Sequence, residues 1–226
     1  MSAKKIVIAI DGVVGSGKST TARLVAHALG YRHLDTGAMY RTVALAANRC
    51  GVVADDEAGL EQLLSGLQID LLPSDGGGRV LLNGEDITED IRRPEIARSV
   101  GAFADKPVVR RALVARQQVL GLQGGIVAEG RDMALVVFPD AELKIRMVAD
   151  LDVRTHRRHA ELVAKGLDTS FNQVRADIER RDLEDAQRDY GADGTRAEYV
   201  ELDTTGMDLD EQVAAVVSLA RGCGAE

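Results

Sequence analysis

The chain has 226 residues, a net charge of −8 and 45% hydrophobic residues, which is enough for one sizeable core. The acidic balance argues against a general nucleic-acid or membrane surface, so an anionic substrate must be bound by local clusters of arginine. Cys50 and Cys223 form no Cys-x-x-Cys arrangement, and the four histidines show no metal-ligand pattern. Because the chain shows no signal-peptide pattern and no run of about 18 apolar residues, we expect a cytoplasmic protein.

A hydrophobic strand and a glycine-rich loop stand near the beginning of the chain. Residues 6–10 are apolar and mostly β-branched, and residues 12–19 fit the pattern G-x-x-x-x-G-K-[ST] of a Walker A phosphate loop. Glycines let backbone N–H groups approach a polyphosphate, Lys18 supplies charge to the β- and γ-phosphates, and Ser19 supplies a hydroxyl to Mg²⁺. The predicted nucleotide-binding residues are Gly12, Val13, Val14, Gly15, Ser16, Gly17, Lys18, Ser19 and Thr20.

A helix, a short strand and a second helix follow the loop. Apolar residues at helical spacing predict a helix over 18–29. A short strand is predicted over 31–34, and a second helix, capped by Asp35 or Thr36, runs toward Gly51. Tyr40 and Arg41 then lie just beyond the carboxyl end of a strand, where open α/β sheets bind ligands. In isolation, packing for Tyr40 and a solvated charge for Arg41 are the more common roles.

Residues from about 63 to 98 interrupt the alternation of strands and helices. We predict a small antiparallel β insertion here, followed by a helix from about Arg93 and another after Pro107. Its predicted strands are 67–72, 79–82 and 85–88, with a glycine-rich turn at 74–78.

The alternating pattern resumes with a short hydrophobic strand at 125–130. Glu129 ends this strand in the position of a Walker B acid, able to hold Mg²⁺ directly or through water, and Asp11 at the end of the first strand competes for that role. Either carboxylate is equally suited to bracing the loop instead. Strands predicted at 143–148 and 199–203 and a helix at 209–220 complete a five-stranded parallel sheet.

A charged helical stretch runs from Asp152 to Arg188. Most such stretches are solvated helix faces. Arg181, Asp185 and Arg188, however, are spaced i, i+4, i+7, so two guanidinium groups and a carboxylate share one face and are able to clamp phosphates. A helical lid of this kind would exclude water from a phosphate site.

With these residues assembled, the chain resembles the bacterial cytidylate kinases, of the nucleoside monophosphate kinase group. The resemblance covers nearly the whole length and rests on the phosphate loop, LDTGAMYR at 34–41, EGRDM and VVFPDA within 129–141, RRDLEDAQR at 180–188 and LDTTG at 202–206. It implies an α/β fold with a three-layer P-loop kinase core and a five-stranded parallel sheet. The implied domains are a core of 1–62 and 99–226 with its lid within about 152–190, and an NMP-binding β insertion of 63–98.

The resemblance also implies transfer of the γ-phosphoryl group of ATP to CMP or dCMP, with Mg²⁺. From the size of the chain we expect a monomer, and we expect no nucleic-acid or membrane partner. The implied substrate-binding residues are Thr36, Tyr40, Arg41, Arg110, Arg131, Asp132, Arg181, Asp185 and Arg188, of which Arg110, Asp132 and Arg188 read cytosine. The residues expected to stabilise charge on the transferred group are Lys18, Arg131, Arg157, Arg158 and Arg181.

The chain departs from the pattern of this family at several places. Val13 replaces a usual proline, Gly101 stands where a base-contacting serine is expected with Ser99 nearby, Ala134-Leu135 replaces Gly-Thr, and 189–193 replaces a pattern of small residues and proline. Two alternatives therefore stay open, a kinase for another nucleoside monophosphate such as UMP and a nucleotide-binding regulatory module with little turnover. A GTPase is disfavoured because the sequence contains no N-K-x-D.

Overall fold

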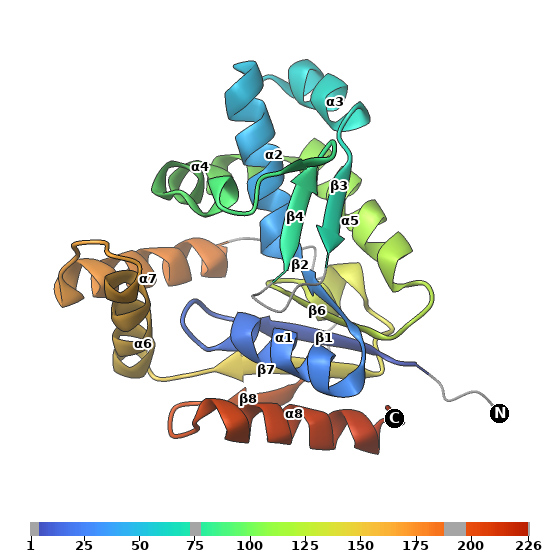
Figure 1. The fold of residues 1–226 in the computed structure, drawn as a ribbon, viewed down its shortest axis with the longest axis vertical. Helices are drawn as coiled ribbons and strands as arrows, with labels where there is room; N and C mark the ends of the chain where they lie inside the picture. The colour runs from blue at the N-terminus through green and yellow to red at the C-terminus, as the bar shows by residue number, and fades with distance from the viewer. Residues whose placement is uncertain (1–4, 73–77, 188–197, 226) are drawn as a thin grey trace. The chain divides into compact units, whose positions relative to one another are not determined.

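A computed structural model describes residues 5–72, 78–187 and 198–225 of the protein (Figure 1). Contacts divide the chain into two compact units, one formed by the segments up to His33 and from Gly124 onward, the other by Leu34–Gln123. The expected insertion at 63–98 falls within the second unit. Among the described residues, no helix combines the length and the apolar character that crossing a membrane requires.

The first unit is built on a five-stranded parallel sheet, as the sequence predicted, with the strand order β2-β6-β1-β7-β8 (Figure 1). The strands are β1 (Val7–Gly12), β2 (Arg32–Asp35), β6 (Ile126–Gly130), β7 (Leu143–Val148) and β8 (Val200–Asp203). In the centre, Ile8 of β1 lies opposite Val127 of β6 and Leu143 of β7. The carboxyl ends of β1 and β6 therefore meet at one edge of the sheet.

The core of this unit lies between the sheet and two helices, α1 (Lys18–Leu29) and α8 (Leu209–Gly222), which pack side by side (Figure 1). Ile8 of β1, Val25 of α1 and Val216 of α8 are fully buried and belong to one hydrophobic cluster. The apolar run of β1 is continuous rather than alternating because helices and neighbouring strands bury Ile8, Ala9 and Ile10 completely.

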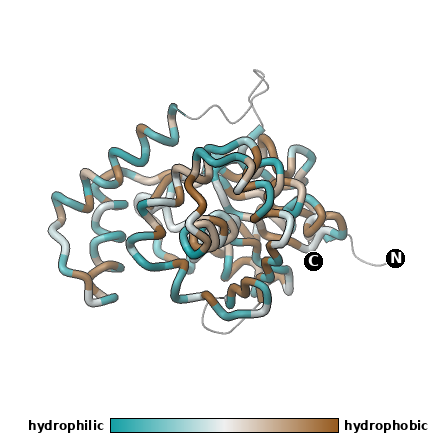
Figure 2. The backbone as a smooth tube through the Cα atoms, turned by 90° about the horizontal axis from the view of Figure 1, so that it is seen from above, coloured by the Kyte–Doolittle hydropathy of each residue, from teal (hydrophilic) through white to brown (hydrophobic). Residues whose placement is uncertain are grey.

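Two further helices, α6 (Leu151–Ala164) and α7 (Phe171–Gln187), pack against each other in the region expected to be charged and helical. Hydrophilic residues predominate along α7, with hydrophobic residues recurring among them (Figure 2). Val174 and Ile178 are its buried residues, so one narrow apolar stripe holds an otherwise polar helix.

The second unit combines helices with a small antiparallel sheet of order β3-β4-β5. Its elements are α2 (Thr36–Cys50), α3 (Glu57–Ser65), β3 (Ile69–Leu72), β4 (Arg79–Leu82), β5 (Glu85–Asp86), a 3₁₀ turn (Asp90–Arg92), α4 (Pro94–Ala104) and α5 (Pro107–Gly121). The antiparallel strands were predicted, although β3 and β5 are shorter than expected. The predicted turn at 74–78 lies almost wholly outside the described residues.

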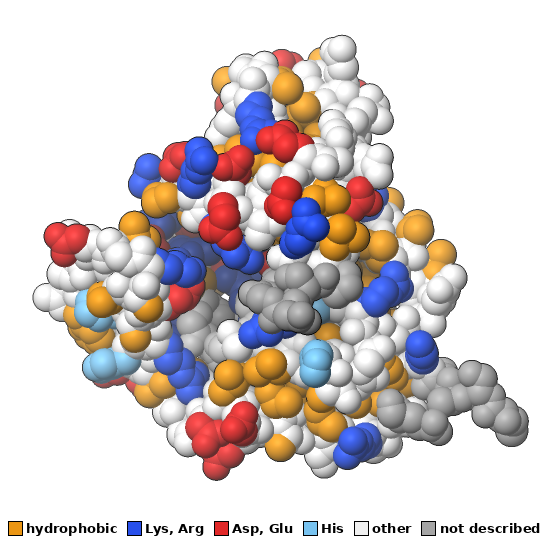
Figure 3. Space-filling model, in the orientation of Figure 1, with side chains coloured by type: hydrophobic (Ala, Val, Ile, Leu, Met, Phe, Trp, Pro, Cys, Tyr) orange, Lys and Arg blue, Asp and Glu red, His pale blue; other side chains and the backbone are white. Residues whose placement is uncertain are grey.

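Helix α3 was not predicted, because its nine residues are too few to show a clear period. The Asp56 side chain caps it by accepting a hydrogen bond from the N–H of Gly59. Basic and acidic side chains lie side by side over the second unit (Figure 3). The ion pairs of this unit include those of Arg49 with Glu85 and of Arg79 with Asp86. These pairs are solvent-exposed, so each contributes little to stability.

Two valines on α5 provide a matched test of this packing. Val109 is fully buried and Val119 is 65% exposed. Because both substitutions gain the same helix propensity, Val109→Ala is expected to lower the free energy of unfolding by about 1.5–3 kcal/mol relative to Val119→Ala. Urea unfolding followed by circular dichroism measures the difference. Equal free energies for the two variants would contradict the placement of α5.

Candidate active site

The phosphate loop runs from β1 to α1 and is shaped by two glycines in the left-handed region. Gly15 has φ 78° and Gly17 has φ 91°, a conformation that residues with a Cβ rarely adopt. A Cβ at Gly17 would also lie 2.7 Å from Gln212 Oε1. Because Gly17 directly precedes α1, the phosphate loop leads into the N-terminus of a helix, whose positive end favours an anion there.

Glu129 lies beside this helix start, at the end of β6. The Ser19 hydroxyl donates to Glu129 Oε2 at 2.6 Å, and His33 Nε2 lies 3.4 Å from Glu129 Oε1. Burial favours a raised pKa for Glu129, but the contact with His33, the charge of Lys18 and the Ser19 hydroxyl together hold that pKa below its ordinary value. Glu129 is therefore an ionised, buried carboxylate next to the Walker A serine.

Asp11 is the other candidate acid, and its carboxylate has different neighbours. It accepts hydrogen bonds from the N–H groups of Met133 (2.8 Å) and Ala134 (3.0 Å) and from the Tyr199 hydroxyl (2.9 Å). Burial raises the pKa of Asp11, with the charge of Asp132 adding to the rise and the three hydrogen bonds opposing it. Asp11 therefore braces the π-helical turn Met133–Val137, which directly follows Asp132.

Arg131 connects the end of β6 to the phosphate loop and to α7. Its Nη1 donates to the Gly12 carbonyl at 2.7 Å, and its Nε donates to Asp185 Oδ2 at 2.6 Å. Asp132, the next residue, is only 4% exposed. The structure thus brings Arg131 and Asp185, both predicted as substrate-binding residues, into one ion pair.

Three arginines predicted for the site lie close enough to influence one another. Burial, followed by the like charge of Arg131 and then that of Arg158, lowers the pKa of Arg181 below its ordinary value, while the carboxylates of Asp177 and Asp185 oppose the fall. Like charges held together in a partly dry environment are costly unless an anion offsets them. The cluster formed by Arg131, Arg158 and Arg181 is therefore suited to binding a phosphoryl group.

Arg157 makes its contacts at the loop after β8. It donates to the carbonyls of Thr204 (2.6 Å) and Met207 (3.1 Å) and to the Thr204 hydroxyl (3.1 Å). That hydroxyl donates to the carbonyl of Ser16 at 2.9 Å, so Arg157 supports the phosphate loop through Thr204. These contacts fit a supporting role better than direct contact with a substrate.

Three residues in this unit were not singled out from the sequence, namely His33, Arg154 and Tyr199. His33 and Tyr199 meet their partners across long stretches of chain and carry no local signal. Arg154 did carry a local signal. Arg157 and Arg158 follow it by three and four residues, a spacing that places all three side chains on one side of α6.

The second unit holds the residues predicted for a monophosphate. Asp35 caps α2 by accepting from the N–H of Ala38 at 2.8 Å and pairs with Arg41 at 3.2 Å. Thr36, at the start of α2, is buried, and Tyr40 lies one turn further on. Arg110 lies on α5 and is partly buried. Arg188 and residues 189–193 lie outside the described residues.

The serine near Gly101 does not occupy the same side of α4. Ser99 Oγ donates to the Ile96 carbonyl at 3.4 Å and accepts from Asn48 Nδ2 at 3.5 Å. Two residues apart on a helix means a rotation of about 200°. Ser99 therefore faces away from the direction in which a side chain at 101 would point.

Comparison with known proteins gives a consistent match along the chain. Residues 8–222 match the family described as cytidylate kinase. A cytidylate kinase of Pelodictyon phaeoclathratiforme is 46% identical over 222 residues, which is 96% of each chain. Another from Syntrophotalea carbinolica is 45% identical over 208 residues, covering 92% of this chain and 88% of the relative, and one from Geobacter sulfurreducens is 41% identical over 216 residues, covering 96% and 93%.

The lowered pKa of Glu129 predicts a specific dependence of stability on pH. Because the pKa in the folded protein lies below the ordinary value of 4.5, ionised Glu129 stabilises the fold above that value, and this contribution is lost as the pH falls below it. The free energy by which the wild type exceeds Glu129→Gln should therefore shrink between pH 6 and pH 3 in denaturant titrations. A difference that stays constant or grows would contradict this account.

Proposed function

The chain belongs to the cytidylate kinase family, and we propose that it transfers the γ-phosphoryl group of ATP to CMP or dCMP, giving ADP and CDP or dCDP. The observation that carries the proposal is the hydrogen bond from Arg131 to the Gly12 carbonyl of the phosphate loop, which fixes a guanidinium group beside the predicted ATP site, with Arg158 and Arg181 completing an arginine cluster. Such a cluster matches the three charged oxygens of a phosphoryl group in transfer.

The phosphate loop would hold ATP through its backbone. N–H groups at the start of α1 and the charge of Lys18 bind the β- and γ-phosphates. We propose that Mg²⁺ is held on the Ser19 side, because a hydroxyl and an ionised carboxylate lie 2.6 Å apart there and both are oxygen donors that Mg²⁺ prefers. Glu129 suits this role better than Asp11, whose carboxylate already accepts three hydrogen bonds.

Within the described part of the chain, no group of three or more His, Cys, Asp or Glu side chains is arranged to hold a metal ion. This agrees with an ion held mainly by phosphate oxygens and water, with few protein ligands. Bound there, Mg²⁺ would offset the negative charge of the β- and γ-phosphates.

The acceptor would be read by a second set of residues. Thr36, Tyr40 and Arg41 fit the monophosphate, following the family resemblance. Asp132 is a buried carboxylate able to accept from the exocyclic amine of cytosine, whereas uracil presents a carbonyl oxygen at that position. Such a site penalises UMP, because a buried carboxylate facing a carbonyl has no donor to pair with.

The transfer needs no nucleophilic side chain. A phosphate oxygen of CMP attacks the γ-phosphorus while the bond to the β–γ bridging oxygen breaks, and ADP leaves with that electron pair. Lys18, Arg131 and Arg181 stabilise the charge on the transferred group.

We place the reaction in pyrimidine nucleotide metabolism, in a cytoplasmic monomer. A kinase for UMP and a regulatory module are less well supported, because the relatives that match most of this chain are named cytidylate kinase.

The proposal is tested by ADP release from ATP and Mg²⁺ with CMP, dCMP, UMP, AMP and GMP offered separately, against a control without acceptor. We expect turnover that depends on CMP or dCMP, and Lys18→Ala is expected to reduce it by at least about a hundredfold without unfolding the protein. Turnover only with another acceptor, or near-normal turnover of Lys18→Ala, would contradict the assignment.

Asp132→Asn tests the reading of the base. The amide places an N–H₂ group where cytosine also presents an amine, so kcat/KM for CMP should fall about tenfold to a hundredfold. The same change should improve kcat/KM for UMP, whose carbonyl accepts from an amide. The KM for ATP serves as the internal control and should stay unchanged. Equal losses for CMP and UMP would show that Asp132 does not select the base.

A further inference from the structure

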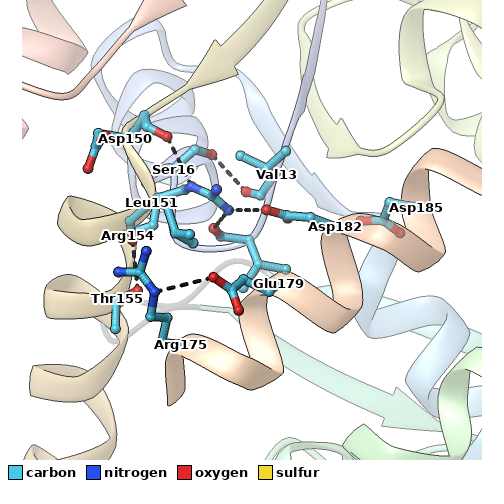
Figure 4. A network of polar contacts seen from close by, with 12 residues as sticks. Val13, Ser16, Asp150, Leu151, Arg154, Thr155, Arg175, Glu179, Asp182 and Asp185 are labelled. Atoms are coloured by element: carbon cyan, nitrogen blue, oxygen red, sulfur yellow. Dashed lines mark hydrogen bonds and ion pairs between the residues drawn. The ribbon is translucent and has the colours of Figure 1, made fainter. Parts of the chain in front are cut away.

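Arg154, on α6, is a buried arginine with acceptors on three different segments of the first unit. Its side chain is only 9% exposed. Nε donates to the Ala149 carbonyl at 3.0 Å, and Nη1 donates to the Val14 carbonyl at 3.3 Å and to Asp182 Oδ2 at 2.7 Å (Figure 4). One guanidinium group therefore joins the end of β7, the phosphate loop and α7.

Apolar packing connects the same segments. Val14 of the phosphate loop belongs to a small hydrophobic cluster with Val174 and Ile178 of α7, against which Leu151 and Leu162 of α6 pack. This cluster is separate from the main core around β1. Val14 thus connects the phosphate loop to α6 and α7 in two ways, through its side chain in this cluster and through its carbonyl, which accepts from Arg154.

The backbone also comes close at this point. A Cβ built on Gly15 would lie 3.0 Å from both Cβ and the carbonyl oxygen of Arg154. Any larger residue at position 15 would push α6 away from the loop. The backbone of the phosphate loop at Gly15 is therefore packed closely against α6 at Arg154.

Asp182 stands directly between residues assigned to the phosphate site. Arg181 precedes it in the arginine cluster, and Asp185, three residues later, pairs with Arg131. Since neighbouring residues on a helix differ by about 100° in direction, fixing Asp182 on Arg154 fixes the rotation of α7 and so the direction of Arg181.

We propose that Arg154 and Asp182 are positioning residues, whose ion pair anchors α7 on the Val14 carbonyl of the phosphate loop and thereby directs Arg181 toward the transferred phosphoryl group and Asp185 toward Arg131. Neither residue contacts the substrate. The inference rests on the proposed kinase function. It gives the Arg154–Asp182 pair a role in orienting α7, which is distinct from binding the phosphates or the base.

A second ion pair between the same helices supplies a matched control. Arg175 of α7 pairs with Asp152 of α6, but both side chains are well exposed and neither is bonded to the phosphate loop (Figure 4 shows Arg175 beside Glu179). A role in merely holding two helices together would be shared by both pairs. A role in positioning Arg181 belongs to Arg154 and Asp182 alone.

The test compares Asp182→Asn with Asp152→Asn in steady-state assays of the full chain with ATP and CMP. We expect kcat of Asp182→Asn to fall roughly tenfold to a hundredfold with the KM for both substrates changed less than about threefold, because misdirected groups raise the barrier more than they weaken binding. Asp152→Asn should keep kcat within about twofold of the wild type. Asp182→Glu, which retains the charge, should recover part of the loss.

A folded Asp182→Asn that keeps wild-type kcat, or losses equal to those of Asp152→Asn, would overturn the proposal. If Asp182→Asn does not fold, Arg154→Lys replaces it, since an ammonium group keeps the charge but cannot reach all three acceptors. Hydrogen exchange of α7 on addition of ATP gives a readout that needs no turnover. Protection in the wild type that is lost in the variant supports the anchor even if no transfer to CMP occurs, and equal protection in both overturns it.

Discussion

A site for polyphosphate must gather positive charge before its ligand arrives, and in an acidic chain that charge is held in place by carboxylates. Arg131 is paired with Asp185, Arg154 is paired with Asp182, and Lys18 lies in the field of ionised Glu129. The two ion pairs each offset a buried or partly buried charge and fix the direction of its side chain at the same time. The arrangement of the phosphate loop, α6 and α7 depends on these ion pairs, because the pairs join the three segments to one another.

The buried acids divide into those that can face a ligand and those that hold the backbone. Glu129 accepts a hydrogen bond from the hydroxyl of Ser19, an exposed residue of the predicted phosphate loop. Asp11 accepts hydrogen bonds from two backbone N–H groups and from the Tyr199 hydroxyl, so it stabilises the turn after Asp132. Two carboxylates at the ends of adjacent strands thus have different tasks, set by the donors that surround them.

The sequence was sufficient to predict what local chemistry determines. The strand, glycine loop and helix at the phosphate site follow from residues close in the chain, and the five parallel strands follow from apolar runs between helices. Helix α3 was missed because nine residues carry little periodicity, although Asp56 was a capping signal. The bond from Tyr199 to Asp11 spans 188 residues, and no local pattern encodes such a contact. The sequence also left open whether Asp11 or Glu129 is the Walker B acid. The neighbours of the two carboxylates favour Glu129, because Asp11 already accepts three hydrogen bonds and Glu129 is bonded to Ser19.

The most direct measurement is a crystal structure with ADP, Mg²⁺, aluminium fluoride and CMP, which together mimic the transition state of transfer. The account predicts that Lys18, Arg131 and Arg181 contact the fluoride group while Arg154 stays on Asp182 and the Val14 carbonyl. It also predicts that Asp132 accepts from the amine of cytosine. A complex in which Arg181 faces solvent, or in which the base is bound without Asp132, would contradict it.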